Sequence, residues 1–151
     1  MIVYRMEKEK YQDFWPSRGA LYSEGRWNKP GQWIVYCSES IALCKLEVLA
    51  NSGNLPISRV IMSIKIADNA PIYELAEDLM PTLWYDFPYP DVLSEITGEF
   101  IKDNSYVAMK VPSAQSKREF NFLLNPAHEG FSKLVKVISK EPESFDSRLK
   151  S

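Results

Sequence analysis

A glutamate within an apolar stretch is the residue of this sequence best placed to do chemistry. The stretch Ile41–Ala50 has helical spacing, and at about 100° per residue Glu47 falls between Leu43 and Cys44 on one face. A carboxylate at a position that a helix normally buries is costly unless it is paired or hydrogen-bonded. Glu47 is therefore either the partner of a core arginine or a carboxylate held in a pocket for catalysis.

An arginine in a loop is the second candidate. Gly25-Arg26-Trp27-Asn28 comes just before the turn signal Lys29-Pro30-Gly31, so Arg26 is either an exposed turn residue or a clamp for a phosphate or carboxylate. Trp27 and Tyr36 are close by in sequence and could wall a pocket for a flat heterocycle, although such rings also pack in cores. The glycines are too dispersed for a phosphate-binding loop, so side chains would have to hold any dinucleotide.

A serine and the only histidine complete the set. Val111-Pro112-Ser113 places a hydroxyl directly after a predicted strand. Ser113, His128 and an acid such as Asp146 could form a hydrolase triad, but the G-x-S-x-G context of a strained nucleophile turn is missing. Asn125-Pro126 is a turn signal, so His128 either hydrogen-bonds the backbone there or belongs to a site.

The pattern of apolar residues predicts the elements that position these candidates. Expected strands are Gln32–Cys37, Val60–Ile66, Tyr106–Val111, Phe120–Leu124 and Leu134–Ile138. The clearest helix is Ile41–Ala50, capped by Ser38 or Ser40, and weaker helical patterns cover Ile72–Leu79 and Val92–Asp103. Because strands and helices do not alternate regularly, we expect one compact α+β domain over residues 1–151, with a mixed or antiparallel split sheet.

Composition narrows the function classes. The chain has 151 residues, 45% of them hydrophobic, which is enough for a core without disulfides or metal. A net charge of −2 with scattered lysines and arginines argues against nucleic-acid binding, and no apolar run is long enough to span a membrane. A single histidine and two cysteines argue against a transition-metal site. We expect a cytoplasmic protein with buried thiols at Cys37 and Cys44.

In combination, the motifs resemble the RES domain, the toxin half of the RES–Xre toxin–antitoxin systems. Each motif alone is weak, but their order matches that of the family over nearly the whole chain. The matching stretches are Tyr4-Arg5, Gly25-Arg26-Trp27-Asn28, Val35-Tyr36-Cys37-Ser38, Leu46-Glu47, Val111-Pro112-Ser113, Asn121 with Asn125-Pro126-Ala127-His128, and Phe145-Asp146-Ser147-Arg148-Leu149.

The resemblance implies a fold similar to that of ADP-ribosyltransferases and an enzyme that consumes NAD⁺ as its substrate, with no cofactor. It assigns catalysis to Arg26, Glu47 and Ser113. It implies cleavage of the nicotinamide–ribose bond with depletion of NAD⁺ or, alternatively, ADP-ribosyl transfer to a protein; a nucleotide-binding module without turnover is a third possibility. An Xre-type antitoxin is the implied partner, and we expect a homodimer.

Physical reasoning assigns the parts of NAD⁺ to further residues that could bind them. Arg5 and Arg26 suit the pyrophosphate, and their charge favours inorganic phosphate slightly over water as the acceptor of ADP-ribose. Tyr36 is the first choice and Trp27 the second for a wall against the nicotinamide. Asn125 and His128 complete the predicted set of substrate-binding residues.

Overall fold

The computed structural model describes residues 1–150, and its centre is a mixed sheet of seven strands. In chain order the strands are β1 (Ile2–Lys8), β2 (Val35–Ser38), β3 (Arg59–Ile66), β4 (Ile72–Glu74), β5 (Ala108–Pro112), β6 (Phe120–Leu124) and β7 (Val135–Glu143). Their order in space is β4-β5-β6-β2-β1-β3-β7. Only β4 and β5 pair in parallel, and all other neighbours are antiparallel. The predicted α+β class with a mixed sheet is confirmed.

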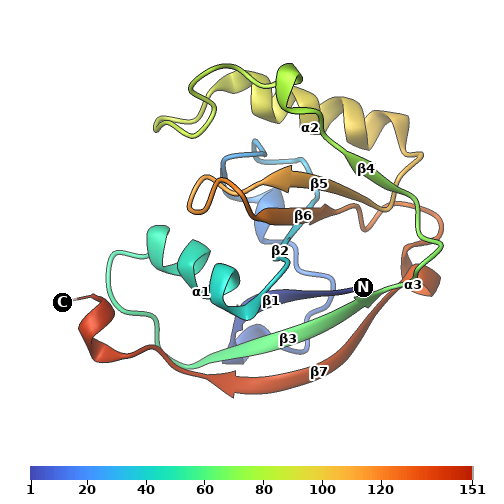
Figure 1. Ribbon diagram of the computed structural model, residues 1–151. Coiled ribbons are helices and arrows are strands. Elements are labelled where there is room, and N and C mark those ends of the chain that lie inside the picture. The colour runs from blue at the N-terminus through green and yellow to red at the C-terminus, as the bar shows by residue number, and fades with distance from the viewer. Residues whose placement is uncertain (151) are drawn as a thin grey trace.

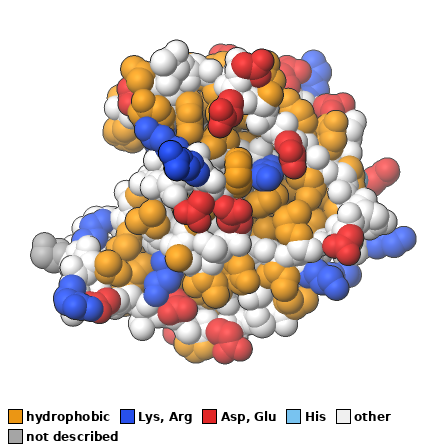
Figure 2. All heavy atoms as spheres, viewed as in Figure 1, with side chains coloured by type: hydrophobic (Ala, Val, Ile, Leu, Met, Phe, Trp, Pro, Cys, Tyr) orange, Lys and Arg blue, Asp and Glu red, His pale blue; other side chains and the backbone are white. Residues whose placement is uncertain are grey.

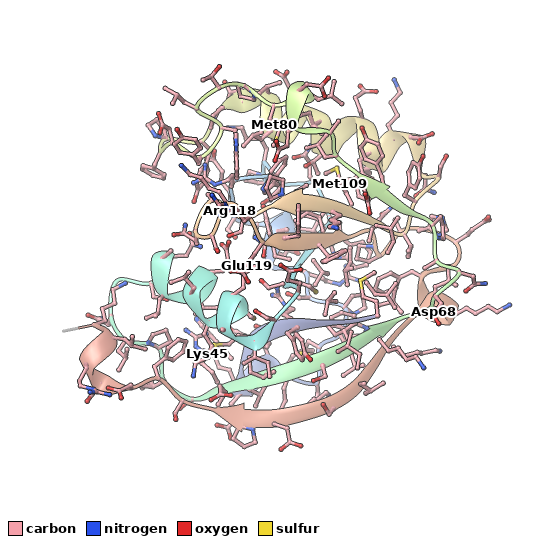
Figure 3. All side chains as sticks on the ribbon, viewed as in Figure 1. Lys45, Asp68, Met80, Met109, Arg118 and Glu119 are labelled. Atoms are coloured by element: carbon pink, nitrogen blue, oxygen red, sulfur yellow. The ribbon has the colours of Figure 1, made fainter. Side chains whose placement is uncertain are left out.

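Helices cover this sheet at two separate places (Figure 1). They are α1 (Ile41–Ala50), α2 (Asp91–Asp103) and the single turn α3 (Phe131–Leu134), with 3₁₀ turns η1 (Glu9–Tyr11), η2 (Gly19–Leu21), η3 (Glu77–Leu79) and η4 (Ser147–Leu149). Helix α2 packs Leu93 and Phe100 against Met109 of β5, in the part of the molecule where Figure 3 labels Met80 and Met109. Helix α1 packs Cys44 against Met6 of β1 and Ile61 of β3. None of the helices in residues 1–150 has the length and apolar character needed to cross a membrane.

Most of the predicted elements are present, with shifted ends. Helix α1 has the predicted bounds, and the Ser40 side chain caps it by accepting a hydrogen bond from the Leu43 N–H. Strand β6 also matches residue for residue. The Ile72–Leu79 helix is wrong: residues 72–74 form β4, which pairs with β5, and residues 77–79 form the 3₁₀ turn η3. Pairing at the sheet edge outweighs the weak helical pattern there.

Strand β1 is a central element for which the sequence pattern gave no prediction. Its charged residues break the apolar alternation, yet it is a central strand paired with β3 from Ile2 to Lys8. The charges are tolerated because Arg5 and Glu7 form an ion pair of 3.0 Å along the same strand. Pairing of this kind offsets the cost of placing charges in a partly buried strand.

The sheet is split between β1 and β2. These two strands share one registered pair, Tyr4 with Ser38, whereas β1 and β3 pair along the full length of β1. Past Tyr4 the ladder stops, and Nη1 of Arg5 donates to the Tyr36 carbonyl oxygen at 3.1 Å. A side chain thus replaces the backbone ladder, and the two halves of the sheet separate.

Candidate active site

A cleft of about 480 Å³ lies where the sheet splits, and it is lined by β1, β2, α1 and the loops around them. Figure 2 shows a notch in one side of the molecule between its α2–β5–β6 part and its α1–β1–β3 part. Figure 3 shows the β5–β6 loop, where Arg118 and Glu119 are labelled, and helix α1, where Lys45 is labelled. This loop and this helix border the notch. The cleft walls include Arg5, Arg26, Tyr36, Glu47, Tyr89 and Asn121.

Glu47 lies on α1 and faces the cleft, on the helix face that also buries Leu43 and Cys44. The Ser113 hydroxyl donates to Oε1 of Glu47 at 2.5 Å, and Nδ2 of Asn121 donates to the same oxygen at 2.8 Å. Within residues 1–150, Oε2 has no hydrogen-bond partner. The carboxylate is therefore held by neutral donors on one oxygen, not by a core arginine, and its second oxygen is left for a ligand.

Ser113 supports this carboxylate from behind the cleft. Its side chain is fully buried and is not part of the cleft wall. While donating to Glu47, its oxygen accepts hydrogen bonds from the backbone N–H groups of Gln115 at 3.0 Å and Ser116 at 3.3 Å. A hydroxyl has one donor and two acceptor sites, so all of them are used. Ser113 is placed to position Glu47, not to attack a substrate.

Arg26 forms the opposite wall. Its Nη1 donates to the carbonyl oxygens of Trp84 and Asp86, both at 2.8 Å, and its Cζ lies 4.9 Å from the centre of the Tyr89 ring. Partial burial lowers the pKa of the guanidinium, which Tyr89 and Glu47 counteract. Within residues 1–150, Nε and Nη2 have no hydrogen-bond partner. These two donors form the side-on edge that binds an anion through two parallel hydrogen bonds.

Tyr36 and Asn28 hold the loop that carries Arg26. The Tyr36 hydroxyl donates to Oδ1 of Asn28 at 2.6 Å and accepts the Trp27 N–H at 3.1 Å. Burial raises the pKa of Tyr36, so the hydroxyl stays protonated and can make both contacts. A Cβ at Gly25 would lie 2.6 Å from this hydroxyl, so only glycine fits there. Tyr36 lines the cleft, and it also packs against the hydrophobic cluster that contains Trp27.

Trp27 is a poor second choice for a stacking wall. Only 2% of the residue is exposed, and its ring packs against that of Trp84 with a centroid distance of 6.4 Å. The residue contributes to the cleft wall, but its indole is a core side chain. Tyr36 is therefore the better candidate of the two.

Arg5 lines the cleft but is not a free cation. Its Nε and Nη2 donate to Oε2 of Glu7 at 3.2 and 3.0 Å, and Nη2 also donates to the Ser17 hydroxyl at 3.0 Å. With Nη1 bound to the Tyr36 carbonyl, the guanidinium is almost fully engaged. The expectation that Arg5 is open to a pyrophosphate is corrected by this geometry: its main contacts hold the split sheet together.

Asn125 and His128 lie away from the cleft, contrary to the sequence-based prediction. Asn125 is fully buried and directly follows the last residue of β6, whereas Asn121 is near the start of that strand. Nδ2 of Asn125 donates to Oδ1 of Asn104 at 2.8 Å. Nδ1 of His128 accepts the Gly130 N–H at 3.0 Å, which is the backbone alternative considered for this turn. Neither residue lines the cleft, so the structure provides no Ser113–His128 hydrolase pair.

Three site residues were missing from the sequence-based set. Asn28 and Asn121 stood within the matched motifs, but only the pairing of strands and loops shows that their amides meet Tyr36 and Glu47. Tyr89 carried no signal, because it reaches the cleft through a long loop before α2. Among residues 1–150, no three His, Cys, Asp or Glu side chains are grouped so that they could hold a metal ion.

Comparison with known proteins gives a consistent result. A family model described as "RES domain" matches residues 2–146. The chain is 34% identical to "Toxin Res" of Photorhabdus laumondii over 99% of this chain and 97% of that protein. It is 33% identical to "Prs ADP-ribosylating toxin" of Sphingobium sp. over 87% of this chain and 83% of that protein. A chain of the crystal structure of the M. tuberculosis MbcT–MbcA toxin–antitoxin complex superposes with a TM-score of 0.68 at 15% identity, covering 98% of this chain and 85% of that one.

Proposed function

This chain belongs to the RES domain family, and from that premise we propose that it is the toxin of a bacterial toxin–antitoxin system that cleaves the nicotinamide–ribose bond of NAD⁺. Relatives named as toxins cover its whole length, which supports the first part of the proposal. A relative named as an ADP-ribosylating toxin supports the second part, because ADP-ribosyl transfer from NAD⁺ breaks this bond.

The observation that carries the proposal is that one cleft is lined both by Glu47, which is hydrogen-bonded through Oε1 alone, and by Arg26, whose Nε and Nη2 have no hydrogen-bond partner within residues 1–150. Nicotinamide leaves NAD⁺ as a neutral molecule, so the enzyme has to hold the dinucleotide and stabilise the positive charge that develops on the ribose. A fixed carboxylate in a partly water-excluded pocket stabilises such a charge. Oε2 of Glu47 serves this purpose, or binds the ribose hydroxyls, as carboxylates do in other dinucleotide sites.

The other walls accommodate the rest of the dinucleotide. The Nε–Nη2 edge of Arg26 binds the pyrophosphate through two hydrogen bonds. The Tyr36 ring packs against the nicotinamide. The cleft volume of about 480 Å³ lies within the range of small-molecule sites, on the order of 300–1,000 Å³.

The acceptor of ADP-ribose is a small molecule, water or inorganic phosphate. The sequence-based preference for phosphate relied on two free arginines, and Glu7 compensates the charge of Arg5. Arg26 is left as the cation with an open edge, and the pyrophosphate itself occupies that edge. The structure thus gives no reason to favour phosphate over water. Transfer to a protein is the second candidate, and the name of the Sphingobium relative favours it.

The test is to incubate the purified protein with NAD⁺ and to identify the products by chromatography and mass spectrometry. We expect free nicotinamide, with ADP-ribose if water is the acceptor and its 1″-phosphorylated form if phosphate is. Labelling of one protein by adenylate-labelled NAD⁺, with little free product, would identify the transferase instead. Binding of NAD⁺ without nicotinamide release would contradict the enzymatic proposal and leave a nucleotide-binding module.

The matched variants for this test are Glu47→Gln and Glu99→Gln. Glutamine at position 47 can still accept hydrogen bonds from Ser113 and Asn121, so the fold is retained while the charge is lost. We expect turnover to fall by about 10²-fold or more, as when other preorganised electrostatic groups are removed. Glu99 is exposed on α2, and its variant serves as the control with unchanged turnover.

We also propose a cytoplasmic Xre-type antitoxin as partner, which blocks the cleft, and a homodimeric toxin. The partner is supported by the toxin–antitoxin complex whose chain shares this fold, and the dimer by the prevalence of symmetric oligomers. A complex with the cognate antitoxin should not release nicotinamide. Light scattering that gives a monomer at micromolar concentration would contradict the dimer.

A further inference from the structure

Asn121 lies in a row of residues that crosses the sheet beside the cleft. Ser38 of β2 pairs with Tyr4 of β1 on one side and with Asn121 of β6 on the other, and Asn121 pairs with Val111 of β5. Ser113 comes two residues after Val111. Strand register therefore brings Ser38 beside Asn121 and Asn121 near the end of β5, and hydrogen bonds from Asn121 and Ser113 join this row to Glu47 of α1.

The hydrogen bonds in this row run from Ser38 to Asn121 and from Asn121 to Glu47, with each residue donating to the next. Nδ2 of Asn121 lies 2.8 Å from Oε1 of Glu47, and Oδ1 of Asn121 lies 2.7 Å from the Ser38 hydroxyl. An ionised carboxylate only accepts, so the amide must turn its nitrogen toward Glu47. Its oxygen then faces Ser38, which has to donate. Asn121 and Ser38 are 7% and 4% exposed, so water competes little for these contacts.

The orientation of a carboxylate about its last torsion is broad unless its contacts restrict it. Ser113 approaches Oε1 from the loop that follows β5 and Asn121 approaches it from β6, which restricts that torsion more than a single donor would. We infer that Asn121, oriented by Ser38, is a positioning residue that keeps Oε1 of Glu47 anchored and presents Oε2 to the ribose of the substrate. This inference rests on the proposed cleavage of NAD⁺.

The decisive variant is Asn121→Asp, which keeps the shape and replaces the donor by a second carboxylate. The introduced carboxylate and Glu47 would then share one proton, and both would ionise only at higher pH. The groups facing Glu47 in the cleft are Arg26, Tyr36 and Cys44, and Arg5 and Tyr89 lie on the same walls. None of them is changed by the substitution, so a shifted pH profile would report on the pair alone.

The measurement is the pH dependence of nicotinamide release, with folding checked by thermal unfolding. We expect Asn121→Asp to move the acid limb of kcat/KM to higher pH and to lower the rate most at low pH. Asn121→Ala should lower kcat by about tenfold to 10²-fold through misplacement of the carboxylate. Asn69→Asp adds the same charge on an exposed turn and should keep the wild-type profile.

The outcomes separate the two proposals. A wild-type protein without nicotinamide release removes the proposed function and this inference with it. A wild-type protein that turns over NAD⁺, together with a folded Asn121→Asp protein of unchanged pH profile, overturns the inference alone. If Asn121→Asp does not fold, Ser38→Ala decides, because it removes only the hydroxyl that orients the amide: we expect a several-fold lower kcat with little change in KM, and an unchanged kcat overturns the inference.

Discussion

The hydroxyl oxygen of Ser113 lies 2.5 Å from Oε1 of Glu47 and joins the end of β5 to helix α1. The same oxygen accepts the N–H groups of Gln115 and Ser116, so it also closes the turn that follows β5. One buried side chain thus shapes a loop and holds the carboxylate that faces the cleft. Its contribution to activity is inseparable from its contribution to stability.

Ser113→Ala should therefore lower both turnover and stability. The substitution leaves two backbone N–H groups without their side-chain acceptor and removes one of the two donors to Glu47, each loss being worth about 1–3 kcal/mol. Urea unfolding and nicotinamide release measure the two effects. Ser116→Ala is the control, because the Ser116 hydroxyl contacts only the exposed Glu119 side chain. A Ser113→Ala protein as active as wild type would show that Glu47 needs no support from this hydroxyl.

Arg26→Lys should weaken NAD⁺ binding and lower kcat/KM although the positive charge is retained. A lysine ammonium could still donate to the Trp84 and Asp86 carbonyl oxygens, but it has no second, planar edge to offer to a pyrophosphate. We expect a loss of about tenfold or more in kcat/KM, with a rise in KM as the main component. Arg148→Lys changes an arginine that is 88% exposed near the C-terminus and serves as the control. Near-normal kinetics for Arg26→Lys would make it a structural turn residue.

The spacing of apolar residues predicted those elements that are determined by residues close together in the sequence. The α1 helix was correct because its apolar spacing and its Ser40 cap agree with each other. Strand β1 was missed because Arg5 and Glu7 hide its apolar residues, and their charges are compensated by pairing that only the structure shows. Strand β4 was mistaken for a helix because its three residues form a strand through contact with β5.

The candidate site was predictable to the extent that a single element determines it. The helix face of Glu47 could be read from its spacing to Leu43 and Cys44. The state of Arg5 depends on Glu7, Ser17 and the split beside Tyr36, and these contacts arise only when distant segments meet. His128 illustrates the opposite case, since its local turn explains it fully and no distant contact draws it into the cleft.

His128→Ala should leave NAD⁺ turnover unchanged. The imidazole accepts the Gly130 N–H within its own turn and is not part of the cleft wall, so its loss affects only the local turn. We expect kcat and KM within about twofold of wild type and a small decrease in unfolding free energy, of about 1 kcal/mol. Loss of turnover in a folded His128→Ala protein would restore this residue to the site and reopen the hydrolase alternative.

The two cysteines should be inert toward thiol reagents in the folded protein, although both line the cleft. Burial raises the pKa of both thiols, that of Cys44 to about 11, and the nearby Arg5 only partly counteracts this. Because the thiolate is the reactive form, iodoacetamide should label neither residue quickly at pH 7.5, and both should react at once in urea.

The raised pKa of Cys44 also makes the free energy of unfolding depend on pH. The folded state keeps the Cys44 proton to higher pH than the unfolded chain does, so this stabilisation is complete below about pH 9 and is lost as the pH rises through 11. Unfolding free energy should therefore fall more steeply between these values in wild type than in Cys44→Ala. Rapid labelling of native protein at neutral pH, or parallel stability curves for the two proteins, would contradict this assignment.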